Sequence, residues 1–182
     1  MNVFFEHNNL LLRALEPEDI DILYAWENDS ELWKYGASVS PLSRYAIRQY
    51  LDEARQDIYQ TRQLRLMITL RKDGREQRVG LVDLFDFDPQ HLRAGVGILI
   101  APDFQKQGLG TQSLRLIQRY AFDFLHLSQL YAHIPRQNTA SIRLFRKVGF
   151  CESGVLKNWA RINDAFSDVL ILQLFQNPTV LQ

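Results

Sequence analysis

A single cysteine is present in the sequence, and this scarcity excludes several kinds of structure. Cys151 has no second cysteine with which to form an internal disulfide or a thiolate metal cluster. The four histidines are also scattered, and none lies at ligand spacing from another: His7, His91, His126 and His133. We therefore predict neither a disulfide nor a structural metal.

Net charge and long apolar runs are equally scarce. Lys and Arg number 21 and Asp and Glu number 21, so no overall field attracts nucleic acid or an anionic membrane. No apolar run is long enough to span a bilayer, and residues 1–7 lack the basic stretch and apolar core of a leader peptide. We expect a cytoplasmic protein whose partners include neither nucleic acid nor a membrane.

Apolar residues, in contrast, are abundant. The 182 residues are 46% hydrophobic and 12% aromatic, a composition that supports one substantial core in a chain too short for two ordinary domains. No repeat, low-complexity tract or linker stands out along the sequence. We predict a single domain over residues 1–182.

The first third of the chain predicts one strand and two helices. Residues 10–14 are typical of a strand, and the helix-start signal around Pro17 predicts a helix that continues past Leu23. A second helix is predicted from Ser40 to Ile58, where apolar residues form a rough stripe. Residues 34–39 between the two helices are predicted to be a loop.

The rest of the chain alternates strands with helices. Apolar runs bounded by turn signals predict strands over residues 64–70, 79–87, 95–100, 130–134, 154–162 and 166–175, and helical spacing predicts helices over residues 111–124 and 138–147. The longer of these helices is long enough to join two parallel strands, whereas short turns join the others as hairpins. This order predicts a mixed α/β domain with a mostly antiparallel sheet and flanking helices.

The most informative segment is the glycine-containing loop over residues 105–111. It precedes a predicted helix, and the first backbone N–H groups of a helix are unpaired and carry partial positive charge. Gly108 and Gly110 have no side chain to obstruct a pyrophosphate, and Lys106 can add positive charge. The loop lacks the Lys-Ser or Lys-Thr of a nucleoside-triphosphate site, and Ser113 stands where a dinucleotide fingerprint needs a third glycine.

Written as Gln105-x-x-Gly108-x-Gly110, this loop resembles the pyrophosphate motif of the GCN5-related N-acetyltransferase (GNAT) superfamily. A second segment, residues 138–150, resembles the family segment in which an Asn, a helix and a closing Gly-Phe line the cofactor's pantetheine. Residues 79–84 and 163–172 extend the resemblance over nearly the whole chain. Within the superfamily, the sequence is most similar to the branch of spermidine N-acetyltransferases and ribosomal-protein alanine and serine acetyltransferases.

The resemblance implies an acetyl-CoA-dependent N-acetyltransferase that transfers acetyl directly to a primary amine, without a covalent enzyme intermediate or a metal. It implies that acetyl-CoA wedges between two splayed parallel strands, residues 95–100 and 130–134, where backbone amides polarise the thioester carbonyl. The resemblance assigns these residues to the cofactor: Ile98, Leu99, Ile100, Gln105, Lys106, Gln107, Gly108, Leu109, Gly110, Thr111, Asn138, Ser141 and Phe145.

One departure from the family concerns the acid that protonates the departing thiolate. Many relatives carry a tyrosine at the position of Phe145, which has no proton to donate. A thiolate whose conjugate acid has a pKa of about 8.5 is a tolerable leaving group, so we expect slower transfer rather than none, with Tyr131 or water as the substitute. A non-catalytic acyl-CoA-binding regulatory module is the alternative.

A general base is needed because an alkylamine with a pKa of about 10.4 is almost fully protonated at neutral pH. Asp83 is our predicted catalytic base, since it aligns with an acidic residue in the Gly-Leu-Val-Glu-Leu stretch of spermidine acetyltransferases. Asp86 and Asp88 are weaker candidates that solvated turn positions explain equally well. His133 could act through a water molecule, but on a central strand it is interpreted as a satisfied structural residue.

The acceptor is the least determined feature of the sequence. Residues 34–44 carry two cations and no carboxylate, which favours a protein N-terminus, an amino acid or a small metabolite. Glu27, Asp29 and Glu31 lie nearby and keep a polyamine such as spermidine open as the alternative acceptor. A homo-oligomer also stays open, because the two closing strands can pair across a dimer.

Overall fold

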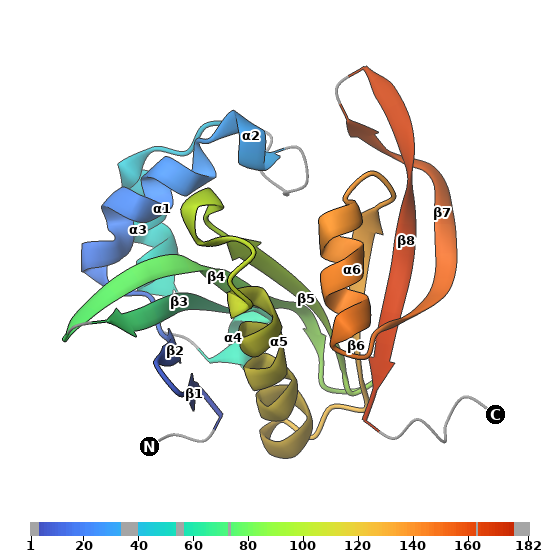
Figure 1. The fold of residues 1–182 in the computed structure, drawn as a ribbon, viewed down its shortest axis with the longest axis horizontal. Helices are drawn as coiled ribbons and strands as arrows, with labels where there is room; N and C mark the ends of the chain where they lie inside the picture. Colours follow the sequence, from blue (N-terminus) through green and yellow to red (C-terminus); the bar gives the residue numbers. More distant parts are fainter. Residues whose placement is uncertain (1–3, 34–39, 54–56, 73, 163, 177–182) are drawn as a thin grey trace.

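One eight-stranded sheet organises the protein, as the computed structural model in Figure 1 shows. The structure describes residues 4–33, 40–53, 57–72, 74–162 and 164–176. The strands are β1 (Glu6–His7), β2 (Leu10–Arg13), β3 (Leu64–Lys72), β4 (Arg75–Asp88), β5 (Arg93–Ile100), β6 (Gln129–Pro135), β7 (Cys151–Ile162) and β8 (Ala165–Phe175). The helices are α1 (Ile20–Glu27), α2 (Ser30–Trp33), α3 (Arg44–Glu53), α4 (Ile58–Thr61), α5 (Leu109–Arg119) and α6 (Thr139–Lys147), with 3₁₀ turns at Pro17–Asp19 and Pro102–Phe104.

The sheet has the order β1-β2-β3-β4-β5-β6-β8-β7. Neighbouring strands are antiparallel except β5 and β6, which are parallel and connected through α5. A parallel pair requires such a crossover, because the chain must return to the end of the sheet where the first strand began. The predicted mixed, mostly antiparallel sheet with one parallel pair is confirmed.

Helices cover both faces of the sheet. The larger core packs α5 and α6 against one face, through buried residues that include Leu114, Ile117 and Phe145. The smaller core packs α1 and α3 against the other face, where Leu23 and Ile47 meet the strands. Because side chains alternate along a strand, each central strand presents successive residues first to one core and then to the other. We refer below to the α5 face and the α1 face.

The second predicted helix differs from the structure at both ends. The second predicted helix begins at Arg44 instead of Ser40, with the Ser43 hydroxyl accepting the backbone N–H of Ala46. It also does not continue to Ile58, because Asp57 has extended backbone angles and its side chain caps a separate helix, α4. A cap side chain competes with helix continuation by satisfying the first free N–H groups of a new helix. The predicted loop at 34–39 lies outside the described residues.

The sequence predicts no structural metal, no disulfide and no membrane-spanning segment, and the structure bears on these points only for the residues that it describes. Within residues 4–33, 40–53, 57–72, 74–162 and 164–176, no three His, Cys, Asp or Glu side chains group as metal ligands. Cys151 is a free, exposed thiol. Over the same ranges, no helix is both long enough and apolar enough to cross a membrane.

Asp19 anchors the start of α1 to the sheet. Its side chain is fully buried and accepts hydrogen bonds from Arg13 on β2, Arg78 on β4 and the backbone N–H of Glu16. Burial alone would raise the pKa of Asp19, but the bonds from Arg13, Glu16 and Arg78 outweigh it and hold the pKa below the ordinary value. Asp19 therefore ties together two strands and a helix that lie far apart in sequence.

We expect Asp19→Asn to lower the free energy of unfolding by about 2 kcal/mol, because charge-assisted bonds to both arginines are lost. Since the folded-state pKa is lowered, the stabilisation is fully present above the unfolded pKa of about 3.9 and disappears as pH falls through the folded value. Denaturant unfolding at pH 7 and pH 2.5 measures this. A difference between the two proteins that is equal at both pH values would contradict it.

Candidate active site

A gap between β5 and β6 is the central feature of the site. The two strands pair only at Arg93–Gln129, Ala94–Leu130 and Gly95–Tyr131, although β5 continues to Ile100 and β6 to Pro135. In Figure 1 they lie together at their starts and separate toward their ends, with α5 and α6 in front. Beyond Gly95, the side of β5 that faces β6 therefore has no strand partner. The resemblance implied such a splay, and the structure contains it.

The glycine loop lies beside this gap on the α5 face. Gly108 has a φ of 79° and begins α5 without a capping side chain, so the first N–H groups of the helix are left for another partner. A Cβ on Gly110 would lie 3.1 Å from Leu144 Cδ2 on α6, so the chain passes close to that helix. Uncapped N–H groups and the positive end of α5 are the elements of an anion site.

Several predicted cofactor residues have structural partners of their own. The Gln105 side chain donates to the carbonyl of Ile100 (3.1 Å), which ties the loop to the end of β5. The Asn138 side chain accepts the backbone N–H of Ser141 (3.1 Å) and caps α6. Phe145 is 2% exposed and packs edge-to-face on Phe150, which leaves little surface for contact with a cofactor. Their contacts with the cofactor stay predictions.

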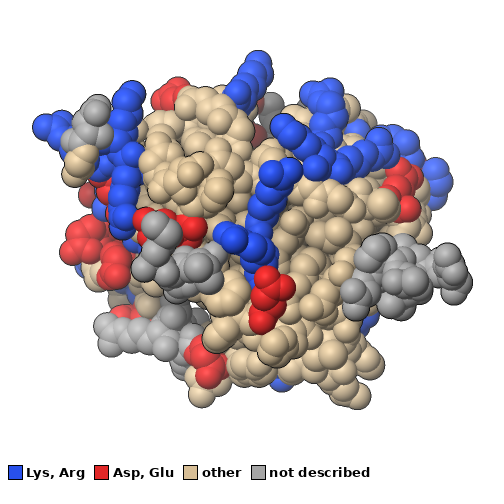
Figure 2. Space-filling model, turned by 60° about the horizontal axis from the view of Figure 1, so that its bottom comes forward, with Lys and Arg blue, Asp and Glu red and all other residues tan. Residues whose placement is uncertain are grey.

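Cations gather on the outer surface of α5 and α6. The two helices carry five exposed Arg and Lys residues and no carboxylate: Arg115, Arg119, Arg143, Arg146 and Lys147. Figure 2, in which the face formed by α5 and α6 lies uppermost, shows Lys and Arg side chains across the upper part of the molecule. The chain is neutral overall, so this is a local positive field that suits a phosphate-rich ligand.

Asp83 lies on the α1 face of β4, opposite Gly97 of β5. A Cβ on Gly97 would be 4.0 Å from Asp83 Oδ2, so the carboxylate borders the arm of β5 beside the gap. Arg65 Nε donates to Asp83 Oδ1 (2.5 Å), and Arg65 Nη1 donates to Glu27 Oε1 (2.9 Å). Burial raises the pKa of Asp83, and the Arg65 guanidinium opposes that rise. The predicted base is therefore held in an ion-pair network.

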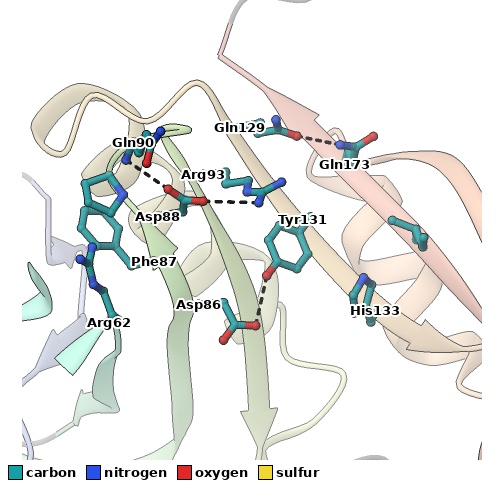
Figure 3. Close-up of a pocket in the computed structure, with 12 residues that line it drawn as sticks. Arg62, Asp86, Phe87, Asp88, Gln90, Arg93, Gln129, Tyr131, His133 and Gln173 are labelled. Atoms are coloured by element: carbon teal, nitrogen blue, oxygen red, sulfur yellow. Dashed lines mark hydrogen bonds and ion pairs between the residues drawn. The ribbon is translucent and has the colours of Figure 1, made fainter.

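A pocket of about 740 Å³ opens on the α1 face at the closed end of the gap. Figure 3 shows Asp86, Tyr131 and His133 directed into it from β4 and β6. Tyr131 donates its hydroxyl to Asp86 Oδ2 (3.3 Å), and Arg93 pairs with Asp88 (3.3 Å). No described Lys or Arg forms an ion pair with Asp86, so its carboxylate brings negative charge to the pocket.

A bulge in β4 directs Asp86 into this pocket. The register between β4 and β5 shifts between Phe85 and Asp88, and Asp86 has a φ of 49°, which a non-glycine residue seldom adopts. Burial and the neighbouring Asp86 carboxylate raise the pKa of Tyr131 to about 12, so the phenol stays protonated at neutral pH. The sequence left Asp86 open between a weaker candidate base and a solvated turn position; in the structure it is exposed, lies in β4 and lines the pocket.

The interpretation of His133 as a satisfied structural residue is wrong. Its side chain is exposed, lines the pocket and has no hydrogen-bond partner among the described residues. Its ring lies 5.3 Å from that of Tyr131. The available signal was the alternation along β6, in which Gln129, Tyr131 and His133 occupy one face and Leu130, Ala132 and Ile134 the other.

The two faces of the gap thus offer two different sites. Coenzyme A combines a pyrophosphate with a chain of amides, and these are the groups that an uncapped helix start and an unpaired strand edge can bind. The pocket on the opposite face is open to a second substrate. A fold with these two sites is suited to a two-substrate acyltransferase.

The comparisons give the family. The family model for the acetyltransferase (GNAT) domain matches residues 9–151, and the chain belongs to this family. It is an acetyltransferase. The resemblance of the sequence to this superfamily, and to its spermidine branch, is confirmed.

The similar proteins include several spermidine enzymes. Spermidine N(1)-acetyltransferase of Escherichia coli (strain K12) is 28% identical over 170 residues, which cover 93% of this chain and 88% of the relative. The structure of spermidine N-acetyltransferase from Vibrio cholerae in complex with CoA and spermine has a TM-score of 0.82 at 24% identity and covers 93% of this chain and 97% of that chain. A dodecameric structure of the Vibrio cholerae enzyme has a TM-score of 0.79 at 24% identity and covers 96% of this chain and 98% of that chain.

Proposed function

We propose that this acetyltransferase transfers acetyl directly from acetyl-CoA to a primary amine, on a protein N-terminus, an amino acid or a small metabolite. One observation supports the proposal. The gap between β5 and β6 lies beside the glycine loop on one face, and on the other face it lies beside a pocket that contains the Asp86 carboxylate. A thioester reaching through the gap would meet an amine arriving from the opposite side. This geometry brings both substrates together without a covalent enzyme intermediate.

The proposed cofactor site uses backbone groups more than side chains. The N–H groups of Leu109, Gly110 and Thr111 would hold the pyrophosphate, and Lys106 is exposed beside them. The free edge of β5 at residues 98–100 would pair with the pantetheine amides. The cations of α5 and α6 would attract the ribose phosphate. The acetyl group supplies the electrophilic carbon, and the protein orients it toward the α1 face.

Asp83 remains our proposed proton acceptor. Two protons must leave an acceptor that binds as an ammonium ion: one before the nitrogen can attack, and one as the amide forms. Asp83 borders Gly97 on the face from which the amine would arrive. Burial raises the pKa of Asp83, which makes its carboxylate a stronger base. The hydrogen bond from Arg65 holds that carboxylate in position. Phe145 supplies no acid, so sulfur would be protonated from solvent.

A polyamine is the second candidate acceptor. The spermidine acetyltransferases among the relatives support it, and so does the Asp86 carboxylate, which pairs with no described Lys or Arg and attracts an ammonium group. Arg62 and Arg93 line the same pocket and partly neutralise its negative charge, which disfavours a long polycation. A monoamine needs only one carboxylate, so the pocket supports the broader class. The dodecameric relative supports a homo-oligomer.

A thiol-release assay with acetyl-CoA tests the proposal against amino acids, peptides with different N-termini, monoamines, spermidine and spermine, with CoA binding measured in parallel. We expect turnover with at least one primary amine and none with its trimethylated analogue, which lacks a proton to lose. Preference for spermidine would select the second candidate. Tight CoA binding without turnover on any amine would favour a non-catalytic acyl-CoA-binding module and contradict the proposal.

A further inference from the structure

We propose that His133 accepts the proton that the acceptor nitrogen loses as the amide bond forms. The inference rests on the proposed function, because it assigns a second proton acceptor to the same reaction. It stands on the placement of the imidazole beside the gap, on the open pocket around it and on the absence of any described partner that occupies its nitrogens.

The placement of His133 follows from the register of β6. Tyr131 forms the last pair with β5, and His133 comes two residues later, on the arm of β6 that has separated from β5. Alternation directs both side chains to the α1 face, while Ala132 between them is buried on the α5 face. The imidazole therefore borders the gap on the side from which the amine would arrive.

The neighbours of His133 leave it free to act as a base. Tyr131 packs beside it from β6, and β8 contributes Ile171 and Gln173 to the same wall. The charged groups that face the pocket are Asp86 and Asp88 from β4, Arg93 from β5 and Arg62 after α4. Arg93 is paired with Asp88, and Asp86 with the Tyr131 hydroxyl. The Tyr131 phenol has a pKa of about 12 and keeps its own proton.

The chemical step balances with the groups present. The amine nitrogen uses its lone pair to bond to the acetyl carbon, and the carbon–sulfur bond breaks with both electrons going to sulfur. The nitrogen, now positively charged, loses one proton to the uncharged imidazole of His133. The imidazolium releases that proton to solvent through the open pocket, and the thiolate takes up a proton from water. Imidazole suits this role because it ordinarily titrates near neutral pH.

The test compares His133→Gln and His133→Ala with the control His7→Gln, in which an exposed histidine on β1 is replaced far along the sheet. Wild-type protein and the three variants are assayed with the amine that wild type uses. We expect kcat to fall about thirtyfold in both His133 variants, with KM for acetyl-CoA and the thermal midpoint unchanged. The pH profile of kcat should differ from wild type in both variants, and the control should behave as wild type.

Added imidazole should restore part of kcat in His133→Ala but not in His133→Gln, because only alanine leaves space for the free base. A merely structural role would show no such rescue. Wild-type kcat and pH profile in both variants, or a loss without rescue, overturns the inference alone. Wild-type protein that acetylates no amine overturns the proposed function and this inference together.

Discussion

Gly108→Glu is expected to raise the Kd for CoA at least about a hundredfold, equivalent to about 2.7 kcal/mol. The added carboxylate would stand at the uncapped start of α5, where the proposed pyrophosphate needs N–H groups and positive potential. The space around Gly108 accepts a side chain, since the nearest atom to an added Cβ is Gln112 Nε2 at 4.0 Å. The loss is therefore expected in binding more than in folding, and isothermal titration with CoA measures it.

Two variants isolate the cause of this loss. Gly74→Glu introduces the same change at another glycine with positive φ and open surroundings, at the turn between β3 and β4, and should leave CoA affinity unchanged. Gly108→Ala adds the backbone strain without the charge and should cost about 1 kcal/mol of stability with a small effect on affinity. CoA affinity in Gly108→Glu equal to wild type would remove the glycine loop from the cofactor site.

Asp83→Asn is expected to lower kcat about a thousandfold with little change in CoA affinity, because the amide cannot take a proton. The active form of Asp83 is the carboxylate, so wild-type kcat should fall as pH drops through its raised pKa. That acid limb should be absent from the profile of the variant. Steady-state kinetics from pH 4.5 to 8 check both expectations.

The matched control for this variant is Glu27→Gln. Glu27 is the other carboxylate that pairs with Arg65, so its loss disturbs the same ion-pair network without removing the carboxylate beside Gly97. We expect kcat to fall much less in Glu27→Gln than in Asp83→Asn, at similar cost to the thermal midpoint. Equal losses of kcat in the two variants would mean that the network positions Arg65 and that Asp83 is not the base.

Local patterns in the sequence predicted much of the fold. The strands of the centre and the C-terminal half were predicted within a few residues, because apolar runs and turn residues mark them directly. The start of α5 was visible in Gly108 and Gly110, since a helix start after glycines is a local property. The division of the second helix at Asp57 was missed, because a weak apolar stripe continued across the cap.

The site was harder to predict than the fold. The prediction of Asp83 as the base rests on the family resemblance. Arg65 lies 18 residues from Asp83 and 38 residues from Glu27 in the sequence, so no local pattern shows that the three side chains form one network. The sequence favours a structural role for His133, because a histidine on a central strand is more often a satisfied structural residue than a base. In the structure, β6 is covered by α6 on one face and lines an open pocket on the other.

The sequence by itself determined the order of elements, the mixed sheet and the glycine loop, because each depends on residues within one turn or one strand of each other. Only the tertiary structure decided where β5 and β6 separate, which carboxylates are paired and which side chains meet at the pocket. Tyr131 and Asp86 are 45 residues apart and come into contact through strand register and a bulge. Such contacts depend on the packing of whole elements, which a local pattern does not contain.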